Sequence, residues 1–183
     1  MNRGLYRNKY RIESSRAQWW DYRSSAPYFI TICTIKRYHL FGYIEEGEMH
    51  LNDLGMKVWE CWYEIPEHFP FVELINFVVM PNHVHGLLYL HNDKKAINPV
   101  ETLHATSLQP PQTPQQKNEH RSEISPKKGS LSSIIRSFKS AVTTYANDNN
   151  LQSGWQERFH DHIVRNADEY RRIFDYITNN PKN

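Results

Sequence analysis

Two apolar stretches joined by a proline and an asparagine occupy the middle of the chain, where residues 72–90 read VELINFVVMPNHVHGLLYL. Residues 72–79 are almost continuously apolar, which is typical of a central strand covered on both faces. Pro81 and Asn82 supply a turn into a second strand that carries two histidines. We therefore predict an antiparallel pair of strands at the centre of a sheet.

His83 and His85 are separated by one valine on the second of these strands. Side chains two residues apart on a strand point to the same face, so both imidazoles project together. They could supply two nitrogen ligands to a metal, but a metal site needs at least one further protein ligand. The alternative is an exposed or hydrogen-bonded pair on a half-buried strand.

The flanking segments predict one sheet with covering helices. β-Branched and aromatic residues at 28–35 predict a buried strand, residues 42–51 predict a hairpin, and residues 155–164 predict an edge strand. Apolar residues recur at helical spacing from the N-cap Asn52 to a stop at Pro66, from the N-cap Ser130 through residue 145, and over residues 167–180 before Pro181. The order of these segments predicts an α+β, ferredoxin-like (RRM-like) antiparallel sheet with covering helices.

Length and composition predict one domain with two additions. The chain has 183 residues, enough for one ordinary domain. Residues 91–129 are rich in proline and polar residues and contain no Phe, Tyr or Trp, so we expect a flexible insertion there. The predicted organisation is a basic, aromatic segment at 1–23 followed by a single domain at 24–183.

The location expected from the sequence is the cytoplasm. The two cysteines, Cys33 and Cys61, lie far apart and suit a reducing compartment. No apolar run has the length of a signal peptide or a membrane span. The net charge of +2 does not by itself indicate a nucleic-acid-binding protein.

Two surfaces nevertheless have the residue types that contact nucleic acid. Residues 1–23 interleave cations with aromatic rings, as a phosphate backbone with stackable bases requires; alternatively, the rings dock on the domain. On the helix from Ser130, the face opposite the apolar stripe carries small polar and basic side chains, which suit phosphate contacts or simply face solvent. The candidate residues are Arg7, Arg11, Arg16, Trp20, Tyr22, Arg136 and Lys139.

The last predicted helix places two polar groups away from its core face. Its apolar stripe consists of Tyr170, Ile173, Phe174 and Ile177. Tyr176 lies roughly 110° from the centre of that stripe, and Asn180 lies roughly 70° from it on the same side. One turn apart, the two could reach a common point. A phenol and a carboxamide oxygen would then stand beside the two imidazoles.

The chain resembles the HUH single-tyrosine transposases, and most closely the REP-associated tyrosine transposase group. The resemblance is carried by His-apolar-His on a strand and by YITNNP at residues 176–181 on a terminal helix. Apart from the insertion, further matching stretches cover nearly the whole chain. They are WDY at 20–22, YFITIC at 28–33, SFKS at 137–140, WQ at 155–156 and DHIVR at 161–165.

The resemblance implies an HUH endonuclease fold and a role for each residue of this set. His83 and His85 would bind a divalent metal, Mg2+ or Mn2+, with Asn180 as the third ligand. Tyr176 would attack a DNA phosphodiester, leaving a 5′-phosphotyrosine, and a second strand's 3′-hydroxyl could reverse the step in DNA transposition and recombination. A tyrosine is only about 0.1% ionised at neutral pH, so the attack needs assistance.

The resemblance also implies a partner, single-stranded or hairpin DNA, and a nucleoid-associated location in the cytoplasm. One alternative function is a domesticated protein that binds a hairpin without cutting it, and another is an RNA-binding module of the same topology. The second histidine pair, His160 and His162, has a charged residue between its members, which disfavours a metal site. The sequence leaves open whether Tyr176 works with the histidines of its own chain or with those of a partner in a homodimer.

Overall fold

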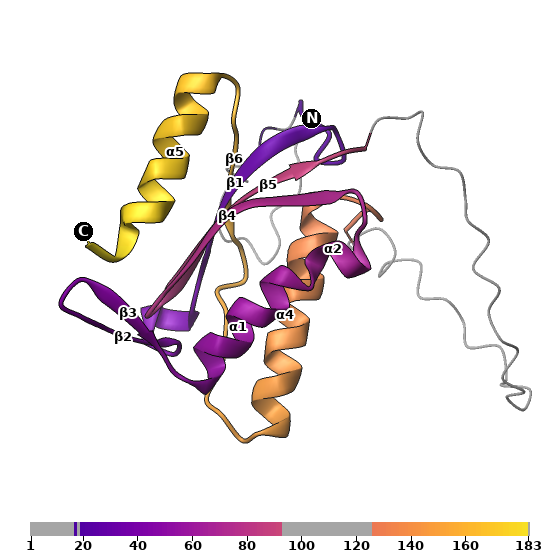
Figure 1. The fold of residues 1–183 in the computed structure, drawn as a ribbon. Helices are drawn as coiled ribbons and strands as arrows, with labels where there is room; N and C mark the ends of the chain where they lie inside the picture. Colours follow the sequence, from indigo (N-terminus) through magenta and orange to yellow (C-terminus); the bar gives the residue numbers. More distant parts are fainter. Residues whose placement is uncertain (1–16, 18, 93–125, 183) are drawn as a thin grey trace, which may run out of the picture.

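The computed structural model describes residues 17, 19–92 and 126–182. A four-stranded sheet forms its centre, with α1 and α4 on one face and α5 on the other (Figure 1). The strands of this sheet are β1 (Ala26–Cys33), β4 (Val72–Met80), β5 (His83–Leu90) and β6 (His160–Ile163). The helices are α1 (Asp53–Tyr63), α2 (Ile65–His68), α4 (Leu131–Asp148) and α5 (Ala167–Asn179). A separate hairpin of β2 (Gly42–Glu45) and β3 (Glu48–Leu51) and two 3-10 turns, Ile35–Arg37 and Asn180–Lys182, complete the described elements.

The strands lie in the order β4-β5-β1-β6, and every neighbouring pair is antiparallel. Together with the chain order β1, α1, β4, β5, α4, β6, this is the ferredoxin-like arrangement, so the predicted fold class is confirmed. The central position predicted for residues 72–79 is wrong, because β4 is an edge strand. Helices pack on both faces of β4, α1 on one and α5 on the other. Its residues are therefore apolar on both faces although β4 has a strand neighbour on one edge only.

The main core lies between the sheet and the α1/α4 layer, and Trp62 is its largest fully buried side chain. The indole stacks on Phe77 at 4.4 Å between ring centroids and meets the edge of Phe138 at 5.6 Å. Gly86 of β5 faces the same ring, and a Cβ at this position would lie 2.3 Å from the indole. Only a glycine lets the sheet approach Trp62 this closely.

Side chains at the helix starts explain where the helices begin. Asn52 Oδ1 accepts a hydrogen bond from the Gly55 amide, and the Ser130 side chain accepts one from the Ser133 amide, so both predicted N-caps are confirmed. The predicted stop at Pro66 is wrong in detail. The helix α1 ends at Tyr63, and Pro66 lies in the first turn of α2, where the missing N–H of proline costs nothing.

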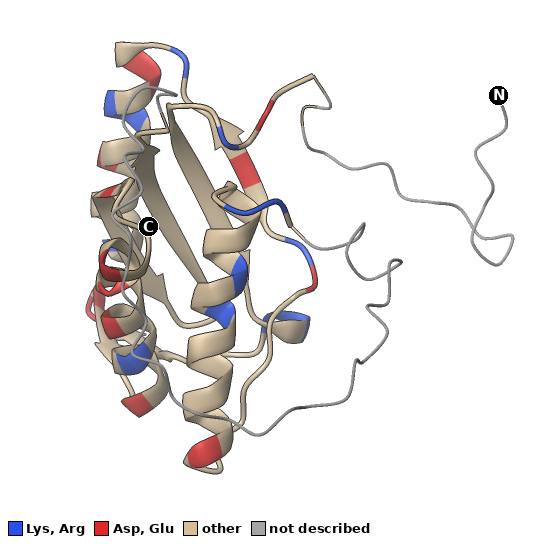
Figure 2. Ribbon diagram, turned by 90° about the vertical axis from the view of Figure 1, so that its right-hand side faces the viewer, with Lys and Arg blue, Asp and Glu red and all other residues tan. Residues whose placement is uncertain are grey.

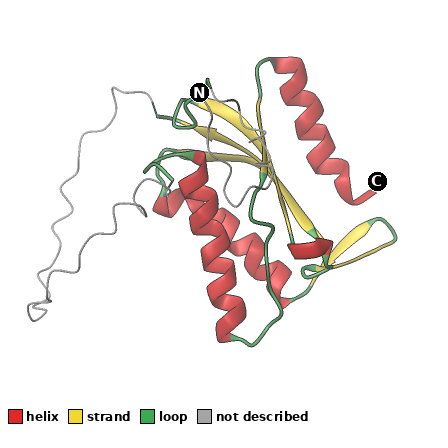
Figure 3. Cartoon of the chain, turned by 180° about the vertical axis from the view of Figure 1, so that it is seen from behind, coloured by secondary structure: helices red, strands yellow, loops and turns green. Residues whose placement is uncertain are grey.

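The helix α5 stands alone on its face of the sheet, opposite the α1/α4 layer (Figure 3). Ile173 and Ile177 pack there with Leu87 and Val164 in a second, smaller apolar cluster. Phe174 is 38% exposed, so its predicted place in the core is wrong: the buried stripe of α5 is narrower than its apolar sequence. Acidic and basic residues are intermixed along this helix (Figure 2).

Most of the predicted insertion, residues 93–125, lies outside the described residues, as does most of the segment 1–23. The described ends of the insertion meet, because Asn92 Nδ2 donates a hydrogen bond to the Gly129 carbonyl at 3.1 Å. Among the described helices, none combines the length and the apolar character that crossing a membrane requires.

Candidate active site

The two histidines of β5 stand side by side, with their Nε2 atoms 3.1 Å apart. The neighbouring strand β1 fixes one of them, since Thr31 pairs with His85 in the sheet register and its Oγ1 lies 2.8 Å from His85 Nδ1. The other is fixed by the turn before β5, where Asn82 Oδ1 lies 2.7 Å from His83 Nδ1. Both rings are thus oriented through Nδ1 and present Nε2 to a common point.

These partners determine which nitrogen atoms are free to bind a cation. A carboxamide oxygen only accepts hydrogen bonds, so neutral His83 carries its proton on Nδ1 and exposes a lone pair on Nε2. The Thr31 hydroxyl can donate or accept, and it therefore supports either tautomer of His85. With the His85 proton on Nδ1, both Nε2 lone pairs face each other, and this donor arrangement fits a divalent metal.

Burial favours the neutral form of both rings. It lowers the pKa of His85 to about 4, with a further lowering from His83 and from Arg37. Burial likewise lowers the pKa of His83, and the charge of Arg37 adds to the effect. At neutral pH both side chains are therefore unprotonated, which is the form that binds metal ions.

Tyr176 reaches this pair from α5, 91 residues further along the chain. Its phenol oxygen lies 3.3 Å from His85 Nε2, and the ring centroids of Tyr176 and His85 are 5.2 Å apart. Phe29 of β1 packs against both, stacking on His85 at 5.4 Å and presenting its edge to Tyr176 at 6.2 Å. Tyr176 remains 45% exposed.

The position of α5 depends on a side chain that the sequence analysis missed. Asn76 Nδ2 donates to the Phe174 carbonyl at 3.0 Å and to Thr178 Oγ1 at 2.9 Å, which ties β4 to the turn of α5 that carries Tyr176. The register of β4 and β5 shifts between Leu74 and Asn76. A polar residue inside an otherwise apolar strand was the available signal for this contact.

Asn180 follows α5 directly and is buried, with 7% of its surface exposed. Its backbone amide donates to the Ile177 carbonyl, and among the described residues its side chain makes no hydrogen bond to either imidazole. Its role as third metal ligand therefore stays a prediction. Across residues 17, 19–92 and 126–182, no group of three or more His, Cys, Asp and Glu side chains could hold a metal ion. Among these residues, a third ligand for the histidine pair would therefore be of another type.

A hollow of about 380 Å³ opens beside Tyr176 on the same side of the sheet. His162 of β6 lines this hollow, and its Nε2 lies 2.8 Å from Glu169 Oε1. The hydrogen-bond partner of His162 is therefore a carboxylate on α5, and not its sequence neighbour His160. No local sequence pattern predicts this hollow, because its lining residues come from β1, β6 and α5.

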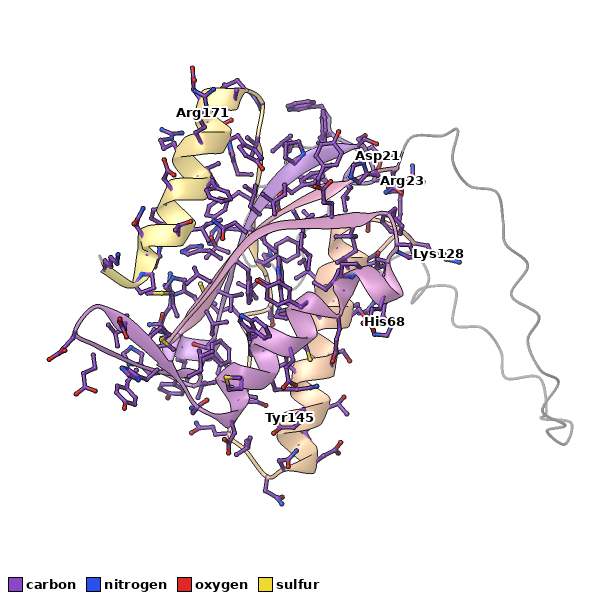
Figure 4. The ribbon with its side chains drawn as sticks, viewed as in Figure 1. Asp21, Arg23, His68, Lys128, Tyr145 and Arg171 are labelled. Carbon is purple, nitrogen blue, oxygen red and sulfur yellow. The ribbon has the colours of Figure 1, made fainter. Side chains whose placement is uncertain are left out.

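The nucleic-acid candidates of the first segment fall into two groups. Arg7, Arg11 and Arg16 lie outside the described residues. Trp20 and Tyr22 dock on the domain: Trp20 Nε1 donates to the Tyr28 hydroxyl at 2.9 Å, and the Tyr22 hydroxyl accepts from the Ala17 amide at 3.1 Å. Beside them, Asp21 and Arg23 form an ion pair at 2.6 Å (Figure 4).

The remaining candidates, Arg136 and Lys139, lie on α4, on the opposite face of the sheet from Tyr176 (Figure 1). Arg136 is exposed. The ammonium of Lys139 donates to the Gln156 carbonyl at 2.7 Å and so tethers the segment before β6. Neither residue shares a surface with the histidine pair, and their contact with nucleic acid stays a prediction.

Comparisons with known proteins agree with this architecture. No protein-family profile matches the chain. An uncharacterized protein of Haemophilus influenzae is 37% identical over 185 residues, which cover 98% of this chain and 91% of the relative. The solved structure of a REP-associated tyrosine transposase bound to a REP hairpin superimposes with a TM-score of 0.55 at 20% identity, covering 92% of this chain and 73% of that one. The chain therefore belongs to the family of the Haemophilus influenzae protein, and its fold is the one found in a REP-associated tyrosine transposase.

Proposed function

We propose that this protein is a transposase that nicks single-stranded DNA and transfers the strand through a 5′-phosphotyrosine on Tyr176. The observation that carries the proposal is the approach of the phenol oxygen to 3.3 Å from His85 Nε2, with His83 Nε2 3.1 Å from the same nitrogen. A half-exposed tyrosine beside two imidazoles oriented through Nδ1 combines a nucleophile with two metal-ligand atoms.

His83 and His85 would hold a divalent ion, Mg2+ or Mn2+, through their Nε2 atoms, and Asn180 would supply an oxygen ligand. The bound ion would act as a Lewis acid at the scissile phosphate. The protein's part is to keep both imidazoles neutral and aimed at one point, through burial and through Thr31 and Asn82.

The chemistry exchanges one phosphoester for another. The phenol of Tyr176 loses its proton, its oxygen bonds to phosphorus, and the bond from phosphorus to the 3′-oxygen breaks. The released 3′-oxygen takes up a proton and becomes a hydroxyl. The 3′-hydroxyl of another strand can then attack the phosphotyrosine in reverse, so rejoining needs no nucleotide cofactor. Because one chain holds Tyr176 and both histidines together here, a single copy can supply the whole set.

The proposed substrate is a hairpin with single-stranded flanks. The solved transposase of the same fold was bound to a REP hairpin, and Tyr176 of this chain is 45% exposed.

The test is to incubate the protein with Mn2+ and a pool of hairpin oligonucleotides with randomised flanks, and to look for a covalent adduct on a denaturing gel. We expect an adduct from the wild type and none from Tyr176→Phe. The matched control is Tyr145→Phe on α4, on the far side of the sheet, which should retain the adduct. An adduct on Tyr176→Phe would refute the role of this residue. Hairpin binding by the wild type without any adduct would favour a domesticated hairpin-binding protein.

A further inference from the structure

The hollow beside Tyr176 is a second feature of this site, distinct from the histidine pair. Its volume is about 380 Å³, and it lies between α5 and the strands β1 and β6. Its lining is Phe29, His162, Glu169, Arg172, Ile173 and Tyr176. Since Tyr176 borders both the hollow and His85, a ligand in the hollow would lie next to the reacting phosphate.

One side of the hollow is apolar and rigid. The ring of Phe29 is held by its stacking on His85 and by its edge contact with Tyr176. Ile173 is buried in the small cluster under α5. A flat ring entering the hollow would therefore meet an aromatic side chain that is already fixed in place, at little further cost in side-chain entropy.

The rim of the hollow carries fixed polar groups. Glu169 Oε1 accepts from His162 Nε2 at 2.8 Å, and Oε2 accepts from the Arg165 amide at 3.0 Å. These bonds lower the pKa of Glu169, with the Arg165 amide as the largest cause. With its Nε2–H donated to Glu169, His162 has Nδ1 left to contact a ligand.

Arg172 adds a forked donor to the same rim. One of its terminal nitrogens lies 3.8 Å from Glu169 Oε1, while 78% of the side chain is exposed, so most of its donors face solvent. The hollow thus offers an apolar wall, a ring nitrogen and a guanidinium fork, which together complement a nucleobase that is apolar on its face and polar along its edge.

We propose that this hollow binds the nucleobase of a nucleotide adjoining the scissile phosphate, with Phe29 against the face of the base and His162 and Arg172 at its edge. The inference rests on the proposed function, since it names a part of the same DNA substrate. It assigns sequence selectivity at one flanking position to side chains of β6 and α5 that take no part in the chemistry.

The test measures binding separately from cleavage. Hairpins with randomised single-stranded flanks are selected by the Tyr176→Phe protein, which keeps the ring but cannot form the adduct, and the bound fraction is sequenced. We expect a base preference at one flanking position. Adding Arg172→Gln should reduce that preference about tenfold, which is the discrimination that one good contact to a base edge supplies. The base preferences at the other positions should stay unchanged.

The matched control is Arg171→Gln, because Arg171 is the neighbouring arginine, points away from α5 into solvent (Figure 4), and does not line the hollow. Its base preference should equal that of the parent. Phe29→Leu provides a second variant, which should weaken binding of the same nucleotide without changing which base is preferred. A flanking preference that Arg172→Gln leaves unchanged, an affinity that Phe29→Leu leaves unchanged, or no flanking preference at all would overturn the inference. The adduct assay above reports the proposed function independently.

Discussion

Acidification should destabilise the fold through His85 in particular. The pKa of a histidine in an unfolded chain is 6.5, and burial lowers that of His85 to about 4 in the folded protein. The unfolded state therefore binds a proton more readily than the native state. The stability contributed by this group is fully present above pH 6.5 and is lost as the pH falls towards 4.

The magnitude follows from the two pKa values. At pH 5 the unfolded histidine is mostly protonated and the buried one is mostly neutral, which corresponds to a factor of about 30 in the unfolding equilibrium, or about 2 kcal/mol. Because His85 is only 5% exposed, solvent screening reduces this figure little. Such a loss is a large part of the stability of an ordinary domain.

The assay is urea unfolding followed by tryptophan fluorescence at pH 7.5 and pH 5, for the wild type and for His85→Gln. We expect the wild type to lose about 2 kcal/mol more than the variant over this range. The control, His68→Gln, replaces an exposed histidine on α2 and measures the effect of removing any histidine. Equal losses in the wild type and in His85→Gln would refute the reasoning.

Three further substitutions test other parts of the structure. Gly86→Ala places a Cβ against the fully buried Trp62 ring and should lower the free energy of unfolding by about 1–3 kcal/mol, measured by urea unfolding. Asn76→Ala removes both hydrogen bonds that tie β4 to α5, so amide hydrogen exchange in the last two turns of α5 should accelerate and adduct formation should slow. Lys139→Met removes the bond to the Gln156 carbonyl and should destabilise the protein while leaving hairpin affinity within about twofold, if this contact is purely structural. A hairpin affinity that falls and becomes less dependent on salt would instead assign Lys139 to a phosphate.

Periodicity in the sequence predicts which face of an element is buried, but not what lies beside the element. The alternation around His83 and His85 correctly placed both on the face opposite Val84, and the order of segments correctly predicted the ferredoxin-like fold class. The apolar run at 72–79 indicated a strand covered on both faces. An edge strand and a central strand can both be covered in this way, so the run did not distinguish between them. In the same way, helical spacing placed Tyr176 off the core stripe, and the structure puts it half-exposed beside His85.

Contacts between distant segments have no local signal. The bonds from Asn76 to α5 span 98 and 102 residues, and the hollow beside Tyr176 combines side chains from three elements. The sequence shows that an asparagine interrupts an apolar strand, but only the fold shows which helix it holds. Phe174 is the converse case: its helical position suits the core, yet 38% of the residue stays exposed.

The proposed metal ligands, His83, His85 and Asn180, carry no negative charge, and we therefore predict that metal and DNA bind cooperatively. Two imidazoles and a carboxamide are all neutral, and no carboxylate joins the histidine pair in the part of the chain that the structure describes. Arg37, on the turn that follows β1, is positive and close enough to lower the pKa of both histidines. A divalent ion therefore enters a site with no opposing charge, and a DNA phosphate is the group that can supply it.

Calorimetric titration with Mn2+ measures this coupling without any turnover, using the Tyr176→Phe protein with and without hairpin DNA. We expect the DNA to tighten Mn2+ binding about 5–150-fold, the usual range of coupling between two ligands, and Mn2+ to tighten DNA binding by the same factor. Arg37→Ala should tighten Mn2+ binding in the absence of DNA, because it removes a repelling charge. Equal Mn2+ affinity with and without DNA would mean that the charge comes from the protein. The third ligand would then be an acidic side chain outside the described residues, in place of the buried carboxamide of Asn180.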